Sequence, residues 1–178
     1  LELFVAYDAS LFIESSIHEV YITLGLTVLL VTLVIYLFLG DWRATLIPAV
    51  TIPVSIIGAF IVLLVMGFSV NLLTLLALVL AIGLVVDDSI VVLENIYKRV
   101  EHGEPSLAAA QRGTAQVAFA VMATTLVLVA VFAPVSLMGG DAGKLFTEFS
   151  WAIMGALLFS AYVALSASPM MCSKFLTA

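Results

Sequence analysis

Residues 83–95 read Gly-Leu-Val-Val-Asp-Asp-Ser-Ile-Val-Val-Leu-Glu-Asn, so two adjacent aspartates, Asp87 and Asp88, lie inside an apolar run. The nearest charged residue before them is Arg43, and the nearest after them is Glu94. A carboxylate in the middle of a membrane-spanning helix costs about 2.5–3.5 kcal/mol on insertion scales. Two in succession therefore need either polar partners or a function, and the rest of the chain is interpreted around them.

The composition is that of an integral membrane protein. Of the 178 residues, 64% are hydrophobic and 10% are charged, whereas a soluble domain has about 45–50% apolar and about 25% charged residues. The net charge of −6 argues against a nucleic-acid partner. We expect the main partner of this surface to be the lipid bilayer.

Five stretches almost free of charge are long enough to cross about 30 Å of hydrocarbon. The sequence therefore predicts an all-α membrane protein, a bundle of five transmembrane helices, at about residues 20–39, 45–66, 71–97, 115–137 and 149–168. A polar loop over residues 98–114 contains a short amphipathic helix that begins near Pro105.

Capping residues and prolines give the expected helix ends. Asn71 or Ser69 caps the third helix, which continues to about Arg99. We expect the fifth span to stop at Pro169, because proline lacks the N–H that continues a helix.

An acidic lead-in, residues 1–19, precedes the first span, and the first helix is expected to begin near Ile17 behind an N-cap at Ser15 or Ser16. The distribution of basic residues predicts the orientation. If the N-terminus is periplasmic, the inner side carries five basic residues and the outer side only Lys144, which satisfies the positive-inside rule. The five are Arg43, Lys98, Arg99, Arg112 and Lys174. The C-terminus is then cytoplasmic.

The spacing around the aspartates predicts how they face their neighbours. Successive residues on a helix point about 100° apart. Ala77, Ala81 and Asn95 share the stripe of Asp88, and the small residues among them would let another helix approach closely. Gly83 leaves room beside Asp87. We therefore expect both carboxyl groups to face a bundle interior shared with two neighbouring helices.

Burial and a neighbouring negative charge both disfavour an ionised carboxyl group. No basic residue lies in any expected span, so without a cation from elsewhere the pair is expected to be largely protonated. A carboxyl group whose protonation depends on a nearby cation suits a proton relay. Two alternatives remain open: a purely structural, hydrogen-bonded pair, and a site for sodium or another cation.

The sequence has no arrangement typical of an enzyme. It lacks a Ser/His/Asp set, a cluster of metal ligands and a phosphate-binding glycine loop, since Gly139-Gly140 is not followed by Lys-Ser or Lys-Thr. We expect no catalytic residue, no metal and no cofactor. Any transport would then draw on an ion gradient.

The stretch over residues 83–95 closely resembles the fourth transmembrane helix of resistance–nodulation–division (RND) transporters, in the hydrophobe/amphiphile multidrug efflux branch. Other segments resemble adjoining parts of that family in the same order, from about Glu14 onward. They are Asp41-Trp-Arg-Ala-Thr-Leu-Ile-Pro48 with Pro53, Gly67-Phe-Ser-Val-Asn-Leu-Leu-Thr74, Phe132-Ala-Pro-Val-Ser-Leu-Met-Gly-Gly140, Glu148-Phe-Ser150 and Pro169-Met-Met-Cys172.

The resemblance implies that the chain corresponds to transmembrane helices 2–6 of the first repeat, half of a two-repeat domain. It implies a proton/drug antiporter of the bacterial inner membrane, with Asp87 and Asp88 as the proton relay and a lysine from the missing second repeat as their partner. Such transporters are trimers that work with a periplasmic adaptor and an outer-membrane channel. The alternatives are a truncated structural bundle without transport activity, and a relative that exports lipid or aids protein secretion.

Overall fold

The computed structural model describes residues 9–176, with the side chains of residues 9–17, 39 and 141 left aside. This part of the chain forms five helices: α1 (Ala9–Leu39), α2 (Trp42–Val65), α3 (Leu72–Glu101), α4 (Ser106–Ser136) and α5 (Gly140–Phe175). All five are long and apolar enough to cross a membrane. The all-α bundle predicted from the sequence is confirmed.

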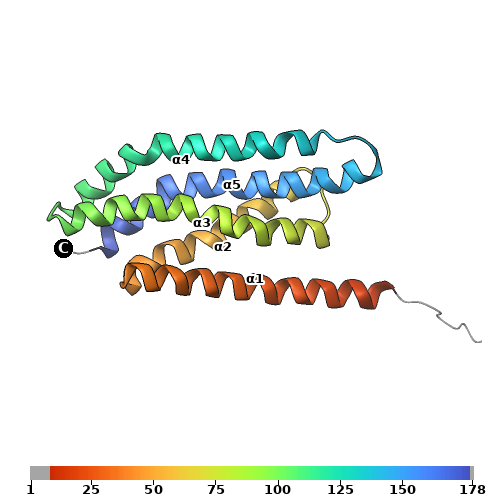
Figure 1. Cartoon of the computed structure of the whole chain (residues 1–178), viewed down its shortest axis with the longest axis horizontal. Helices are drawn as coiled ribbons and strands as arrows, with labels where there is room; N and C mark the ends of the chain where they lie inside the picture. Colours follow the sequence, from red (N-terminus) through yellow and green to blue (C-terminus); the bar gives the residue numbers. More distant parts are fainter. Residues whose placement is uncertain (1–8, 177–178) are drawn as a thin grey trace, which may run out of the picture.

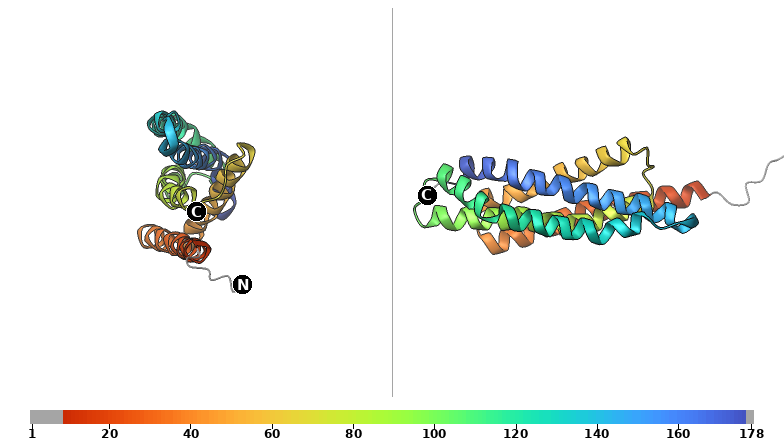
Figure 2. Two further views of the ribbon diagram at one scale, coloured as in Figure 1. Left: turned by 90° about the vertical axis from the view of Figure 1, so that its right-hand side faces the viewer. Right: turned by 90° about the horizontal axis from the view of Figure 1, so that it is seen from above.

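The helices run back and forth along one long axis, with α3 and α5 at the centre (Figure 1). α5 packs against α2, α3 and α4, while α1 packs only against α2 and α3. In the end-on view α1 and α4 lie on opposite flanks (Figure 2). The buried fractions agree with this arrangement. In the most apolar stretch of α5, 61% is buried, whereas in the most apolar stretch of α1 only 6% is buried. The outer helices therefore leave most of their surface uncovered by the rest of the bundle.

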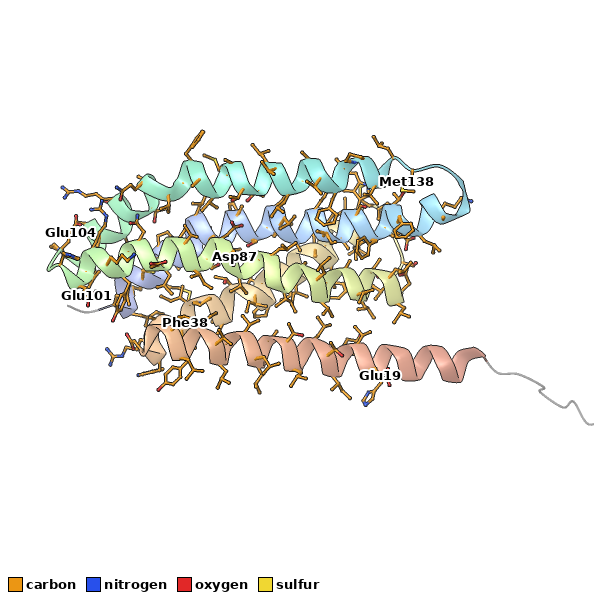
Figure 3. The ribbon with its side chains drawn as sticks, viewed as in Figure 1. Glu19, Phe38, Asp87, Glu101, Glu104 and Met138 are labelled. Atoms are coloured by element: carbon orange, nitrogen blue, oxygen red, sulfur yellow. The ribbon has the colours of Figure 1, made fainter. Side chains whose placement is uncertain are left out.

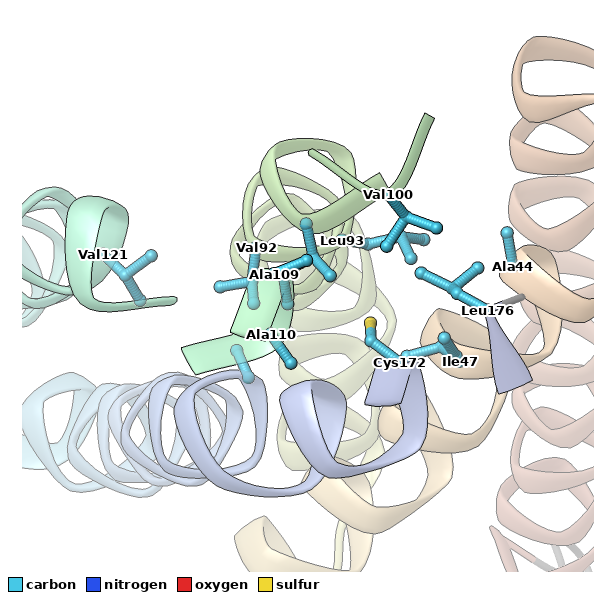
Figure 4. Packing of buried hydrophobic residues seen from close by; sticks show 12 residues of the cluster. Ala44, Ile47, Val92, Leu93, Val100, Ala109, Ala110, Val121, Cys172 and Leu176 are labelled. Atoms are coloured by element: carbon cyan, nitrogen blue, oxygen red, sulfur yellow. The ribbon is translucent and has the colours of Figure 1, made fainter. Parts of the chain in front are cut away.

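Several helices extend beyond the expected bounds. α1 begins at Ala9, not near Ile17, because no glycine or proline interrupts the chain between them. α5 begins at Gly140 and continues through Pro169 to Phe175. The last turn of α5 buries Cys172 and Leu176 in an apolar cluster against α2 and α3 (Figure 4), and this burial outweighs the single hydrogen bond that the proline removes.

The expected separate amphipathic helix before residue 115 is also wrong, because α4 is continuous from Ser106. Gly113 does not break it. A Cβ atom at Gly113 would lie 2.9 Å from Cγ1 of Ile96 and 3.2 Å from its Cα, so this glycine allows α4 to approach α3 closely. By contrast, α3 has the predicted N-cap at Asn71, in a capping box with Thr74.

At the end of the bundle where α3 begins, polar contacts attach the α2–α3 turn to α5. The amide group of Asn71 donates to Oε2 of Glu148, and Ser69 Oγ lies 3.3 Å from the same oxygen. The opposite end carries Arg43, Lys98, Arg99, Arg112 and Lys174, because it holds the α1–α2 turn, the α3–α4 turn and the end of α5. Side-chain nitrogens gather there in Figure 3.

Close packing of α2 on α5 depends on two glycines. A Cβ atom built on Gly58 would lie 2.2 Å from Cγ of Phe159, and one on Gly155 would lie 3.0 Å from Cβ of Val62. Within a membrane the hydrophobic effect does not drive helices together. Small residues stabilise the contact instead, because they let two helix backbones pack closely.

We expect Gly58→Ala to destabilise the bundle by about 1–3 kcal/mol, the usual cost of overpacking. The measurement is the free energy of unfolding in mixed micelles titrated with SDS. Gly25→Ala in α1 is the matched control, because a Cβ atom there meets nothing within 4 Å. Equal stability of the two variants would contradict the packing argument.

Candidate functional site

The two aspartates lie near the middle of α3, far from both ends of the bundle (Figure 3). Asp88 is 16 residues from Leu72 and 13 residues from Glu101 along the helix, or about 24 Å and about 20 Å at 1.5 Å per residue. The pair therefore lies well inside the helix and away from both of its ends.

Asp88 is buried, with 8% of its surface exposed. It faces Ser160 of α5, whose Oγ lies 3.5 Å from Oδ2 of Asp88 and donates to the backbone oxygen of Val85 at 2.9 Å. The hydroxyl groups of Thr124 and Thr125 of α4 face the same carboxyl group. Asp88 thus meets two neighbouring helices, as expected.

Small residues on both helices make this burial possible. Ala77 and Ala81 lie on the stripe of Asp88 and are fully buried, in clusters that join α3 to α2 and α5 and include Ala152 and Ala156 of α5. The predicted small-residue row is confirmed. The residue after Asp88 faces α2. Ser89 Oγ lies 3.0 Å from Oγ1 of Thr51, and this buried hydrogen bond links α3 to α2.

Asp87 differs from the expectation, because its side chain is exposed in this bundle. Together with Asp88, it lines an open groove of about 630 Å³ between α3 and α4, whose other walls include Val91, Ala120 and Thr124. The physical reason is the 100° step between neighbouring helix positions. α5 covers Asp88, and none of the described helices covers Asp87.

Among the described side chains, neither aspartate makes an ion pair, and no three His, Cys, Asp or Glu side chains are grouped closely enough to hold a metal ion. The functional neighbours that sequence reasoning missed are Ser160, Thr124 and Thr125. Their only signal was a hydroxyl group within an apolar run. Many transmembrane helices carry one, bonded to their own backbone, so the signal is weak.

Two helical turns from Asp88, a set of hydrogen bonds joins α3 to α4. Asn95 Nδ2 donates to the backbone oxygen of Gly113 at 2.7 Å and to Oε1 of Gln116 at 3.3 Å. Arg99 donates to the same Oε1 at 2.9 Å and to Glu104 at 2.9 Å. We call Asn95, Arg99, Glu104, Gln116 and the carbonyl of Gly113 the polar clasp.

Glu104 is the charged centre of the clasp. Its two carboxylate oxygens accept from Arg99 and Arg112, each at 2.9 Å. The hydrogen bond and charge of Arg99, with the charge of Arg112, hold the pKa of this carboxyl group below its usual range. Glu104 is therefore ionised at neutral pH.

Comparison with known proteins gives a consistent result. Residues 1–178 match the AcrB/AcrD/AcrF family along their whole length. An uncharacterized transporter of Haemophilus influenzae is 51% identical over 99% of the chain. The multidrug resistance protein MdtC is 49% identical in Escherichia coli and in Salmonella paratyphi B, over 100% and 99% of the chain. The chain spans 17% of the length of each of these relatives.

The charge of Glu104 predicts a pH dependence of the α3–α4 turn. Because the pKa of Glu104 is lower in the folded state, the stabilisation from its ionised form is complete at a pH above the ordinary pKa of 4.5. This stabilisation is lost as the pH falls through the pKa of the folded state. A spin label at His102→Cys, with Cys172→Ala, should stay immobile at neutral pH and become mobile only in strongly acidic buffer.

Glu104→Gln should be mobile at every pH, because the neutral amide has one acceptor oxygen in place of two and no charge to attract Arg99 and Arg112. Glu101→Gln, an exposed neighbour, is the control and should behave like the parent. Equal mobility of Glu104→Gln and the parent at neutral pH would contradict the role of the charge.

Proposed function

The chain belongs to the AcrB/AcrD/AcrF family, and we propose that it forms part of the membrane domain of a proton-driven drug efflux transporter, in which Asp87 and Asp88 relay protons. The RND multidrug resemblance is supported by the same match and by the MdtC relatives. The observation that carries the proposal is the buried Asp88 beside the exposed, groove-facing Asp87, in the middle of α3 and within its apolar stretch.

The two carboxyl groups suit different steps. Asp87 faces the groove, where water or a covering helix can reach it, so it exchanges protons with the surroundings. Asp88 contacts α5 through Ser160 and lies near the hydroxyl groups of Thr124 and Thr125 of α4, which donate within their own helix, so its charge acts on both neighbouring helices. A proton that reaches the pair from the groove thus has a defined effect inside the bundle.

Ser160 couples the charge of Asp88 to α5. A hydroxyl group has one proton to donate and can also accept. When Asp88 is protonated, its O–H donates to Ser160, whose own proton stays on the backbone oxygen of Val85. When Asp88 is ionised, the carboxylate needs the serine proton for itself, and the bond to Val85 weakens. Protonation therefore changes which atom of α3 is bonded to α5.

The groove is where we place the missing counter-charge. An ionised Asp87 facing hydrocarbon would be costly, and the described residues offer it no cation. By family resemblance, a lysine from a second repeat covers the groove and pairs with the aspartates. Proton binding would release that lysine and let its helix move, and the complete transporter would convert the movement into drug export.

The same resemblance supplies the cellular setting of the proposal. The complete transporter, a longer polypeptide that contains this segment, is a multi-pass protein of the bacterial inner membrane, with the start of α1 toward the periplasm and the end of α5 toward the cytoplasm. The five basic residues at one end of the bundle support this orientation. It works as a homotrimer with a periplasmic adaptor and an outer-membrane channel, and it uses the proton gradient without a cofactor.

A second candidate is that these 178 residues alone form an inert structural bundle. It is favoured by the exposed Asp87 and by the 17% coverage of the relatives. Proton uptake by the purified chain in liposomes separates the two: uptake that Asp87→Asn abolishes contradicts the inert bundle. Export of lipid or assistance in protein secretion is a further alternative, tested by the substrates that the complete transporter exports.

In the complete transporter, Asp87→Asn and Asp88→Asn should each abolish export, because an amide cannot take up and release the proton. The measurement is the efflux of a fluorescent dye from cells with equal membrane amounts of each variant. Glu94→Gln is the matched control, an exposed acid on the same helix that pairs with Lys98 at the surface. Undiminished export by both aspartate variants would refute the relay.

Ser160→Ala should shift the external pH at which export is half-maximal, because it removes a hydrogen bond worth about 1 kcal/mol that depends on the charge of Asp88. Ser160→Thr keeps a hydroxyl group and should restore the profile. Ser166→Ala, whose hydroxyl bonds only within α5, is the control. An unchanged pH profile in Ser160→Ala would exclude the coupling.

A further inference from the structure

The contact between α3 and α4 is uneven along its length. At the aspartates the groove opens beside the contact, and Val91 and Ala120, which face it, are exposed. Two turns away the helices touch, since Gly113 leaves no room for a Cβ atom against the backbone of Ile96. α4 is thus packed closely on α3 at one end, whereas at the relay an open groove runs along one side of the contact between the two helices.

The polar clasp lies at the point where the two helices meet. Asn95 is seven residues after Asp88 on α3, and Gln116 is eight residues before Thr124 on α4. These steps correspond to about 10 Å and about 12 Å along the two helices. The clasp therefore holds both walls of the groove at nearly the same distance from Asp88.

The clasp bonds run between side chains of the two helices and the turn between them. Gln116 Oε1 accepts from both Asn95 and Arg99, and Asn95 also reaches the backbone of α4 at Gly113. Glu104 in the turn anchors Arg99. Loss of the Asn95 bonds would leave the backbone of α4 without its polar attachment to α3 at this level.

We propose that the polar clasp is the hinge that sets the width of the groove beside Asp87 and Asp88, which makes Asn95 and Gln116 positioning residues for the aspartate pair. The effect of the clasp on transport rests on the proposed function, but its effect on the width of the groove does not. The groups that face Asp88 are Thr124 and Thr125 from α4 and Ser160 from α5. Asp87 is the one ionisable neighbour among the described side chains around it, so a change in groove width acts on the pair directly.

Two nearly isosteric substitutions test whether the hydrogen bonds of the clasp, and not only its polar side chains, set the width of the groove. Asn95→Asp replaces the donor with an acceptor that faces the Gly113 carbonyl and Gln116 Oε1, so it should break the clasp. Gln116→Glu keeps an acceptor for Asn95 and Arg99, so it should preserve the clasp. Gln111→Glu, an exposed glutamine on α4, is the matched control.

The first measurement is the distance between spin labels at Val91→Cys and Ala120→Cys, with Cys172→Ala, in the purified chain in nanodiscs. We expect a broader and longer distribution for Asn95→Asp and the parent distribution for Gln116→Glu and Gln111→Glu. Circular dichroism checks that each variant is helical. If Asn95→Asp does not fold, Gln116→Leu is measured in its place; it removes the bonds from Asn95 and Arg99 to Gln116 and leaves the bond from Asn95 to Gly113. A parent distribution in folded Asn95→Asp, or in Gln116→Leu where that variant replaces it, would overturn the hinge.

The second measurement is the pH profile of dye export by the complete transporter. Asn95→Asp should lower export severalfold and shift the pH of half-maximal export, and Gln116→Glu should do neither. A lower amount of protein with an unshifted profile would indicate a structural role only and overturn the positioning role. If Asp88→Asn keeps full export while Asn95→Asp widens the groove, the proposed function fails and the hinge stands. If Asp88→Asn abolishes export while the distances stay unchanged, the hinge fails and the relay stands.

Discussion

The structure depends on the close approach of α3 and α5. A carboxyl group cannot remain at mid-height in an apolar bundle unless polar atoms meet it and lipid is kept away. Ala77 and Ala81 on α3 provide that condition, because their small side chains bring α5 close enough for Ser160 to reach Asp88. The glycines that bring α2 onto α5 extend the same principle to the next helix. Small residues at these helix contacts, within a core that otherwise holds mainly Leu, Ile and Val side chains, allow one acid to be buried.

Much of this arrangement could be predicted from the sequence. The stripe shared by Ala77, Ala81 and Asp88 follows from the helical repeat, and the cap at Asn71 follows from the residues that favour helix starts. These features are local, so one helix is enough to predict them. The five-helix bundle follows in the same way from the lengths of the apolar stretches.

The errors arise where a contact with another helix decides the outcome. Gly113 and Pro169 would break an isolated helix, but here close packing on Ile96 and burial of Cys172 keep α4 and α5 continuous. The exposure of Asp87 depends on which side of α3 lacks a neighbour, and the contact of Asp88 with Ser160 depends on the register of α5. Neither is encoded within residues 83–95, so no reading of that stretch alone could have provided them.

The contrast between the two aspartates gives the site its character. They are adjacent in sequence and both border the groove, yet Asp88 is buried against Ser160 of α5 while Asp87 is exposed. The exposed acid is the one that protons from the groove reach first, and the buried acid is the one whose charge acts on the packing of the bundle. Placed side by side on one helix, they connect an accessible surface to a contact between α3, α4 and α5. The groove is then the side of the site that another segment has to complete, and its width decides how closely a counter-charge can approach both acids.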